Sequence, residues 1–337
     1  MRSAARIVRA LLIAAALLAP WAATADDFYK GKTVTVLVGF SPGGGFDTNA
    51  RLLARYLGRH IPGNPTVIVV NMPGGGSSVA ITRLDTDQPK DGTVIDTFNF
   101  GLLANSLLQP NLIKVDFRRY AWIGSISKDL TVCYTFGPAA PKTIAAMTKR
   151  DHFYVGSAGV GTSDDINTKI LKNVFGVPIK QVAGYPGSAD IRVAIERGEL
   201  DGDCGAWSSL PDDWIKGGKV NPVSRSILSS PPDLPKGVPY TLDIAPNDRA
   251  KQIVRFLLAD GELGRPFIVS RAVPADRVKI LRDAFSATMT DKDFLADAEK
   301  LREPVSPTAG DDALKTVNEI YDTPPDIVAA AKKVLEQ

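Results

Sequence analysis

The sequence predicts an α/β protein of two lobes, each built on a mostly parallel sheet flanked by helices. Strands rich in β-branched residues alternate with helical segments along most of the chain, a pattern typical of parallel sheets. The 312 residues that follow residue 25 exceed what one hydrophobic core usually serves. We therefore expect a first lobe of residues 26–128 plus 228–337 and a second lobe of residues 129–227.

Residues 1–25 are predicted to be a signal peptide and not part of the fold. Three arginines give a basic start, a short apolar run follows, and Ala23-Thr24-Ala25 is a small-residue cleavage site. The apolar run is too short for a membrane-spanning helix. We expect export with cleavage after Ala25, and an uncleaved anchor is the alternative.

The charge balance gives no support for a nucleic-acid or membrane-surface partner. The chain has 40 Lys and Arg against 37 Asp and Glu, and the predicted signal peptide holds three of the arginines. The remaining chain therefore carries no formal net charge, whereas nucleic-acid binding is typical of basic chains. The two histidines, His60 and His152, have no neighbouring ligands at useful spacing, so neither a metal nor a cofactor is expected.

The two cysteines, Cys133 and Cys204, both lie in apolar, strand-like segments. In an exported protein an even pair is often a disulfide, and this is our expectation. Two buried free thiols are the alternative.

A recurring unit of strand, glycine loop and helix organises the first half of the chain. The first unit has a strand at residues 34–38, a loop with three consecutive glycines, and a helix at 49–57. Two further units are predicted, with strands at 65–70 and 152–155 and helices at 79–84 and 165–175. Because unpaired N–H groups at a helix start favour anions, such loops suggest an anion cradle.

The other predicted elements complete the two lobes. Further strands are expected at residues 93–98, 122–126, 130–135, 176–182, 200–204, 226–228 and 265–270. Further helices are expected at 189–197, 249–258, 275–289, 292–301, 311–321 and 325–335, and the last four would cover the first lobe.

The motifs favour binding over catalysis. The first glycine loop lacks the Gly-Lys-Ser/Thr of a P-loop, and Thr48 stands where a dinucleotide fingerprint needs its third glycine. No G-x-S-x-G elbow occurs. The acid pairs at 164–165 and 311–312 stand at helix starts, where Asp is favoured by capping. We therefore expect no catalytic residues and no enzyme activity; an exported enzyme with a nucleotide- or anion-binding lobe is the alternative.

Loops at strand ends in the two lobes are expected to face one another across a cleft. Asp47 has two interpretations, a helix cap or a group that orders the loop and a ligand water, and each aromatic side chain has core packing as its alternative. The predicted ligand-binding residues are Ser41, Gly44, Gly45, Phe46, Asp47, Thr48, Asn99, Phe100, Ser157, Gly161, Thr162, Ser163, Tyr185 and Trp207.

An ordered set of motifs runs over nearly the whole chain after the signal peptide. The motifs are Tyr29-Lys30-Gly31-Lys32, Pro42-Gly43-Gly44-Gly45-Phe46-Asp47, Asn71-Met72-Pro73-Gly74-Gly75-Gly76, Lys90-Asp91-Gly92-Thr93, Gly159-Val160-Gly161-Thr162, Gly187-Ser188 and Val273-Pro274-Ala275-Asp276-Arg277. With this set the sequence resembles the Bug-type (TctC-like) periplasmic solute receptors of tripartite tricarboxylate transporters.

The resemblance implies a two-lobe Venus flytrap of type II-like topology in the periplasm. It also implies that a small organic carboxylate lies between the loops at residues 43–48 and 157–163, and that the partners are the membrane permease subunits. A solute-presenting partner of a sensor kinase would use the same fold and remains open. Where the family often has Tyr-Lys-Gly, this chain has Tyr185-Pro186-Gly187, which removes a cationic contact.

Overall fold

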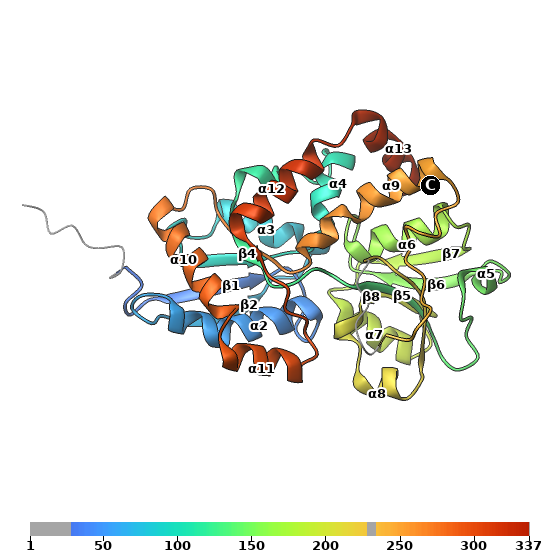
Figure 1. Cartoon of the computed structure of the whole chain (residues 1–337), viewed down its shortest axis with the longest axis horizontal. Coiled ribbons are helices and arrows are strands. Elements are labelled where there is room, and N and C mark those ends of the chain that lie inside the picture. Colours follow the sequence, from blue (N-terminus) through green and yellow to red (C-terminus); the bar gives the residue numbers. More distant parts are fainter. Residues whose placement is uncertain (1–27, 228–233, 337) are drawn as a thin grey trace, which may run out of the picture.

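The computed structural model of the chain describes residues 28–227 and 234–336 (Figure 1). The predicted signal peptide and its cleavage site at Ala25 lie outside these ranges. The described residues form two α/β lobes, one around each of two sheets, as predicted. None of their helices has the length and apolar character needed to cross a membrane.

The first lobe is built on a six-stranded sheet of spatial order β11-β4-β10-β3-β1-β2. β1 pairs in parallel with β2 and with β3, while β10 lies antiparallel between β3 and β4. The strands are β1 (Thr33–Val38), β2 (Thr66–Asn71), β3 (Val94–Thr97), β4 (Ala121–Ser125), β10 (Pro266–Val269) and β11 (Thr308–Ala309).

The second lobe has a five-stranded sheet of order β7-β6-β8-β5-β9. β6 pairs in parallel with β7 and β8, and β5 lies antiparallel between β8 and β9. The strands are β5 (Thr131–Phe136), β6 (Phe153–Ser157), β7 (Ile179–Ala183), β8 (Gly202–Ala206) and β9 (Val220–Arg225).

Both sheets are mixed, whereas strand–helix alternation predicts mostly parallel ones. In each sheet the inserted antiparallel strand, β5 or β10, is the first strand of that sheet after the chain crosses between the lobes. A crossover helix forces its two flanking strands to run parallel, but a strand arriving from the other lobe is under no such constraint.

The helices flank the two sheets (Figure 1). They are α2 (Gly45–Leu57), α3 (Ser78–Thr86), α4 (Leu102–Leu108), α5 (Ile144–Met147), α6 (Ser163–Asn173), α7 (Ser188–Glu196), α8 (Asp212–Lys216), α9 (Asp248–Leu258), α10 (Ala275–Thr288), α11 (Lys292–Lys300), α12 (Gly310–Tyr321) and α13 (Pro325–Glu336). Short 3-10 helices occupy Gly58–His60, Gly75–Ser77, Phe117–Arg119, Trp207–Ser209 and Ala259–Leu263.

Two longer elements, β9 and α4, differ clearly from the predictions, and the short elements α5, α8 and β11 have no predicted counterpart. The strand predicted at 226–228 is wrong where the structure describes it. Ser226 and Ile227 follow the end of β9 and are not in a strand, and residue 228 lies outside the described ranges. The strand β9 contains Pro222, and a proline argues against a strand in the interior of a sheet. Proline is tolerated here because β9 is an edge strand. The helix α4 was not predicted, because it is buried on nearly every side and therefore has no amphipathic pattern.

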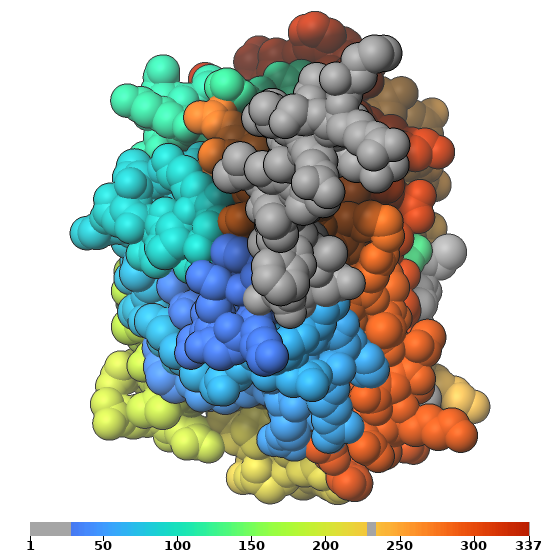
Figure 2. Space-filling view, turned by 90° about the vertical axis from the view of Figure 1, so that its left-hand side faces the viewer, coloured from blue at the N-terminus to red at the C-terminus, as the bar shows by residue number. Residues whose placement is uncertain are grey.

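The C-terminal helices cover the first lobe, as predicted, and the last one also reaches the second lobe. α10 and α11 contact α2, and Figure 2 shows the blue N-terminal part of the chain beside this orange segment. α12 contacts β4, whereas α13 contacts α4, α9 and the second-lobe helix α6. The Nδ2 of Asn173 in α6 hydrogen-bonds a carbonyl of α13. The tail therefore also joins the two lobes.

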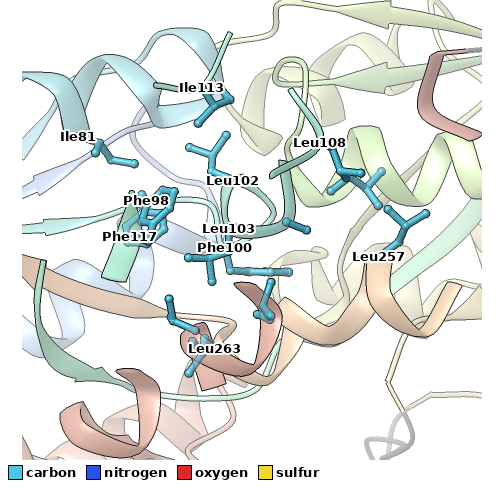
Figure 3. Close-up of a cluster of buried hydrophobic side chains, with 14 of the residues drawn as sticks. Ile81, Phe98, Phe100, Leu102, Leu103, Leu108, Ile113, Phe117, Leu257 and Leu263 are labelled. Carbon is cyan, nitrogen blue, oxygen red and sulfur yellow. The ribbon is translucent and has the colours of Figure 1, made fainter. Parts of the chain in front are cut away.

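The largest hydrophobic cluster centres on the first lobe (Figure 3). Phe98 and Phe117 stack with ring centroids 4.9 Å apart, and Phe100 and Leu257 belong to the same cluster. Ile166 and Ile170 of the second-lobe helix α6 also belong to it, so apolar packing continues from one lobe into the other.

Cys133 in β5 and Cys204 in β8 are joined by a disulfide bond. The two residues are direct partners in the antiparallel pairing of these strands, and both are buried. The alternative of two free thiols does not describe the structure.

Candidate functional site

A buried ion pair lies where the chain first crosses between the lobes. Asp129 is in the segment that links β4 to β5, and Arg265 directly precedes β10. Nη1 of Arg265 lies 2.9 Å from Oδ1 of Asp129, and each side chain is only 4% exposed. The Thr131 hydroxyl also donates to Asp129. Breaking such a pair leaves an uncompensated buried charge, so the pair fixes the position of Arg265.

Arg265 and Asp129 line a cavity of about 60 Å³ between the lobes. Its walls come from the first lobe at Gly44 to Phe46 and from the second lobe at Asp164 and Asp203.

The first-lobe wall presents hydrogen-bond donors. Gly44 and Gly45 stand at the N-terminus of α2, where the N–H groups of the first turn point out of the helix and the helix dipole favours anions. The Arg265 guanidinium lies over the Phe46 ring, 4.8 Å from its centroid. Among the described residues, Nε of Arg265 has no hydrogen-bond partner. This wall therefore suits a carboxylate.

Side chains larger than that of glycine would crowd this wall. A Cβ on Gly44 would lie 2.8 Å from Oγ of Ser188, and one on Gly45 would lie 3.0 Å from Nη2 of Arg265. Both distances are tight for a Cβ contact. The two glycines therefore let the α2 backbone approach the second lobe and Arg265 closely.

The second-lobe wall presents buried carboxyl groups. Asp164 Oδ2 accepts a hydrogen bond of 2.6 Å from the Ala158 N–H, while its Oδ1 has no partner among the described residues. Asp203 Oδ1 accepts from the Cys204 N–H at 2.8 Å. Burial raises the pKa of Asp164 to about 6 and that of Asp203 to about 8, and the nearby Asp164 charge adds to the shift at Asp203.

Direct hydrogen bonds hold the two lobes around this cavity. Asn99 Oδ1 accepts from the Ser163 N–H at 2.9 Å, and Asn99 Nδ2 donates to Ser163 Oγ at 3.1 Å. Ser41 Oγ donates to Asp190 Oδ2 at 2.6 Å. Arg192 Nη2 donates to the Gly43 carbonyl at 3.0 Å. The arrangement is therefore one in which the lobes are closed on each other.

Five of the predicted site residues line this cavity, and a sixth lines its neighbour. Phe100 lies on a second cavity of about 80 Å³, which shares Asp129 and Ser163 with the first. The residues on the first cavity are Gly44, Gly45, Phe46, Asn99 and Ser163.

Asp47 and Ser41 do not line the cavity. Asp47 Oδ2 accepts from the Gly43 N–H at 2.9 Å, and Asp47 Oδ1 accepts from Asn71 at 2.8 Å. Asp47 thus orders the glycine loop, which is one of the two roles that the sequence suggested for it. Thr48 follows it inside α2 and is not part of the cavity wall.

The second-lobe loop differs from the predicted clamp. The Gly161 N–H donates to Asp165 at 2.8 Å, and the Ser163 N–H donates to Asn99, so these two amides already have acceptors within the protein. Gly161 has a φ of +82° and packs against Asn105, which explains the glycine there. Ser157 and Thr162 hydrogen-bond the backbone of their own loop instead of facing the cavity.

Two of the four predicted aromatic residues, Trp207 and Tyr185, are not on the cavity. Trp207 is 2% exposed and packs in the second-lobe core with Leu210 and Trp214, and Tyr185 packs against the same cluster. Core packing, the stated alternative, describes Trp207, whereas Tyr185 is only partly buried at the edge of that cluster. The residues missed were Asp129, Asp164, Asp203 and Arg265. The acid pair at 164–165 was assigned to capping, and nothing near Arg265 in the sequence marks it.

The described residues contain no group of three or more His, Cys, Asp or Glu placed to hold a metal ion. What the geometry provides is a small cavity with hydrogen-bond donors on one wall and carboxyl groups on the other.

Comparison with known proteins identifies relatives over most of the chain. No protein-family model matches. The chain is 26% identical over 318 residues to the UPF0065 protein in the TAR-I ttuE-ttuC' intergenic region of Agrobacterium vitis, covering 88% of this chain and 90% of that protein. It is 28% identical over 200 residues to a UPF0065 protein of Bordetella pertussis, covering 58% of this chain and 60% of that protein.

Solved structures share the fold at low sequence identity. The periplasmic binding protein BugD superposes with a TM-score of 0.74 at 20% identity, covering 91% of this chain and 98% of BugD. MatC from Rhodopseudomonas palustris with bound malate gives a TM-score of 0.71 at 19% identity, covering 90% and 99%. These likenesses confirm the two-lobe periplasmic binding protein fold and the resemblance to the Bug-type, TctC-like proteins that the motifs predict.

Proposed function

We propose that this chain, a homologue of the UPF0065 proteins with the fold of Bug-type binding proteins, is a periplasmic receptor for a small organic carboxylate. The ligand would lie in the cavity between the lobes, and the receptor would deliver it to the permease subunits of a tripartite tricarboxylate-type transporter. The proposal includes no catalytic step.

The first-lobe wall of the cavity is the observation that carries the proposal. The start of α2 at Gly44 and Gly45 offers backbone donors, and Arg265 adds a charged donor whose Nε has no partner among the described residues. A helix start and a guanidinium both favour a carboxylate, and a buried unpaired donor costs free energy until an acceptor meets it.

Two neighbours by fold support the ligand class. MatC has been solved with bound malate, and another Rhodopseudomonas palustris protein with adipate, the latter with a TM-score of 0.70 at 18% identity. Both ligands are small dicarboxylates. The Cys133–Cys204 disulfide supports an oxidising compartment such as the periplasm.

Thermal-shift screening of unfolded and refolded, ligand-stripped protein tests the ligand class. A library of mono-, di- and tricarboxylates is compared with sugars and polyamines. A carboxylate at a hundredfold excess over its Kd should stabilise the protein by about 2.7 kcal/mol. Stabilisation by a sugar or a polyamine, with none by any acid, would contradict the proposal.

A variant locates the binding at the cavity. Gly45→Val places a side chain against Arg265 and should abolish the shift caused by the best acid. Ala145→Val, at an exposed position on α5, is the matched control and should leave that shift unchanged. Equal shifts in both variants would place the ligand elsewhere.

A further inference from the structure

Asn105 is a buried polar side chain without a partner among the described residues. It lies in the first-lobe helix α4 and is fully buried. Neither its amide nitrogen Nδ2 nor its amide oxygen Oδ1 has a hydrogen-bond partner in the described part of the chain. Buried polar groups in native proteins are normally satisfied. Asn105 lines neither of the two cavities, so a ligand held in them does not supply the missing partners.

The second lobe covers this amide. A Cβ placed on Gly161 would lie 1.7 Å from Nδ2 of Asn105 and 2.4 Å from its Cγ, so the two residues are in direct contact across the lobe boundary. Gly101, at the start of α4, approaches the same loop, because a Cβ on it would lie 2.8 Å from the Gly161 carbonyl oxygen. Contact this close leaves no space for a water molecule between Asn105 and Gly161.

A neighbouring contact at the same boundary is satisfied. Asn99 pairs with Ser163 of the second lobe through two hydrogen bonds. The Gly161 N–H, by contrast, already donates to Asp165 at 2.8 Å and is not available to Asn105. Closing the lobes therefore gives Asn99 its partner and leaves Asn105 with none.

We infer that Asn105 opposes closure of the two lobes and thereby lowers the affinity of the receptor. With the lobes apart, Gly161 no longer covers α4, and water hydrogen-bonds the Asn105 amide. Closure removes that water without supplying a protein partner, which costs free energy. In the proposed function the closed form holds the ligand, so the apparent Kd rises as the closed population of the free protein falls. The effect on closure itself does not depend on which ligand the cavity binds.

Two substitutions should move the closing equilibrium in opposite directions. Asn105→Leu keeps a side chain that branches at Cγ and removes both polar atoms, so no amide is desolvated when Gly161 approaches. Asn105→Asp keeps the shape and brings a charge to the boundary, where its burial costs more than that of an amide. The acids Asp164 and Asp165 follow shortly after Gly161, in the first turn of α6, and would add to that cost.

Small-angle X-ray scattering of ligand-stripped protein at pH 7 tests the inference without any ligand. Asn105→Leu should lower the radius of gyration relative to the wild type, and Asn105→Asp should raise it. Asn318→Leu and Asn318→Asp make the same two changes at an exposed position on α12 and should leave the radius of gyration unchanged.

Calorimetric titration with L-malate and with adipate as probes measures the effect on affinity. For a probe that the wild type binds, Asn105→Leu should tighten binding about tenfold, because closure no longer leaves a buried amide unpaired. Asn105→Asp should weaken it at least as much. Asn105→Ala removes the amide without adding bulk and should change the affinity in the same direction as Asn105→Leu.

The outcomes separate this inference from a structural role of Asn105 and from the proposed function. A structural role would make Asn105→Leu and Asn105→Asp both lower the melting temperature and weaken binding, which would overturn the inference. A radius of gyration equal to that of the wild type in Asn105→Leu, Asn105→Ala and Asn105→Asp would overturn it as well. Failure of every acid to bind would contradict the proposed function, and opposite changes in the radius of gyration would still support this inference.

Discussion

Asn99 of the first lobe and Ser163 of the second hold each other across the cleft by two hydrogen bonds. Asn99 Oδ1 accepts from the Ser163 N–H at 2.9 Å, and Asn99 Nδ2 donates to Ser163 Oγ at 3.1 Å. Asn99 Oδ1 also accepts from the Gly101 N–H at 2.9 Å. One side chain thus organises its own loop and the start of α6 in the other lobe, so it stabilises the closed arrangement.

Replacing this side chain should favour the open arrangement. Asn99→Ala leaves the N–H groups of the half-buried Ser163 and the buried Gly101 without acceptors, and a lost buried partner costs about 1–3 kcal/mol. We expect ligand affinity to fall by about ten- to a hundredfold, and the radius of gyration of the free protein, measured by small-angle X-ray scattering, to increase. Asn318→Ala, at an exposed position on α12, should change neither quantity. Unchanged affinity in Asn99→Ala would show that the contact does not help closure.

The ion pair between Arg265 and Asp129 should dominate stability near the crossover. Arg265→Met leaves a buried carboxylate unpaired, which costs about 3–5 kcal/mol of unfolding free energy. Adding Asp129→Leu removes that charge, so the double variant should recover much of the loss. Urea denaturation followed by circular dichroism measures both. A double variant less stable than Arg265→Met alone would contradict this account of the pair.

Reduction of the disulfide should destabilise the second lobe. Cys133 and Cys204 are 71 residues apart, and in the chain-entropy model closing such a loop contributes about 4 kcal/mol. Because both cysteines are buried, reductant should act slowly on the folded protein. The variant Cys133→Ala/Cys204→Ala should therefore melt well below the oxidised wild type in scanning calorimetry. Equal melting temperatures would mean that the crosslink does not constrain the unfolded chain.

The free protein should lose stability as pH rises through the range of the cavity acids. Burial raises the pKa of Asp203 to about 8 and that of Asp164 to about 6, above the usual value of about 4 in an unfolded chain. Between about pH 4 and pH 8 the folded state therefore binds more protons than the unfolded state. The contribution of these acids to the free energy of unfolding falls across that window.

The variant Asp203→Asn isolates this effect. Its free energy of unfolding should rise relative to that of the wild type as pH increases from 4 to 8, measured by urea denaturation at each pH. Asp213→Asn, at an exposed acid, should show no such trend. A difference between Asp203→Asn and wild type that does not vary with pH would mean that Asp203 titrates normally in the fold.

Local sequence patterns predict the order of most helices and strands. They also assign the loop at Gly44 and Gly45 to the site, because a glycine loop followed by a helix start is visible in the sequence itself. Asn99 and Ser163 were found because they follow strand ends. Arg265 could not be found in this way. Its place beside Phe46 depends on the insertion of β10 between β3 and β4, which no local pattern specifies.

The acids were missed for a different reason. Asp164 lies in the first turn of α6, where an acid is expected for its effect on the helix start alone. Only the packed structure shows that Asp164 lines the cavity and that one of its oxygens has no partner among the described residues. Trp207 is the converse case: its position after a strand suggested a wall, and its burial depends on the second-lobe core around it.

The most direct test of the central claim is a calorimetric comparison of each small carboxylic acid with its own primary amide, in ligand-stripped protein at pH 7. The pair differs only in the group that the start of α2 and Arg265 would hold. We predict one-to-one binding of at least one acid and a loss of about a hundredfold or more in its amide. Equal affinity for an acid and its amide, or binding of amides alone, would contradict a carboxylate site in this cavity.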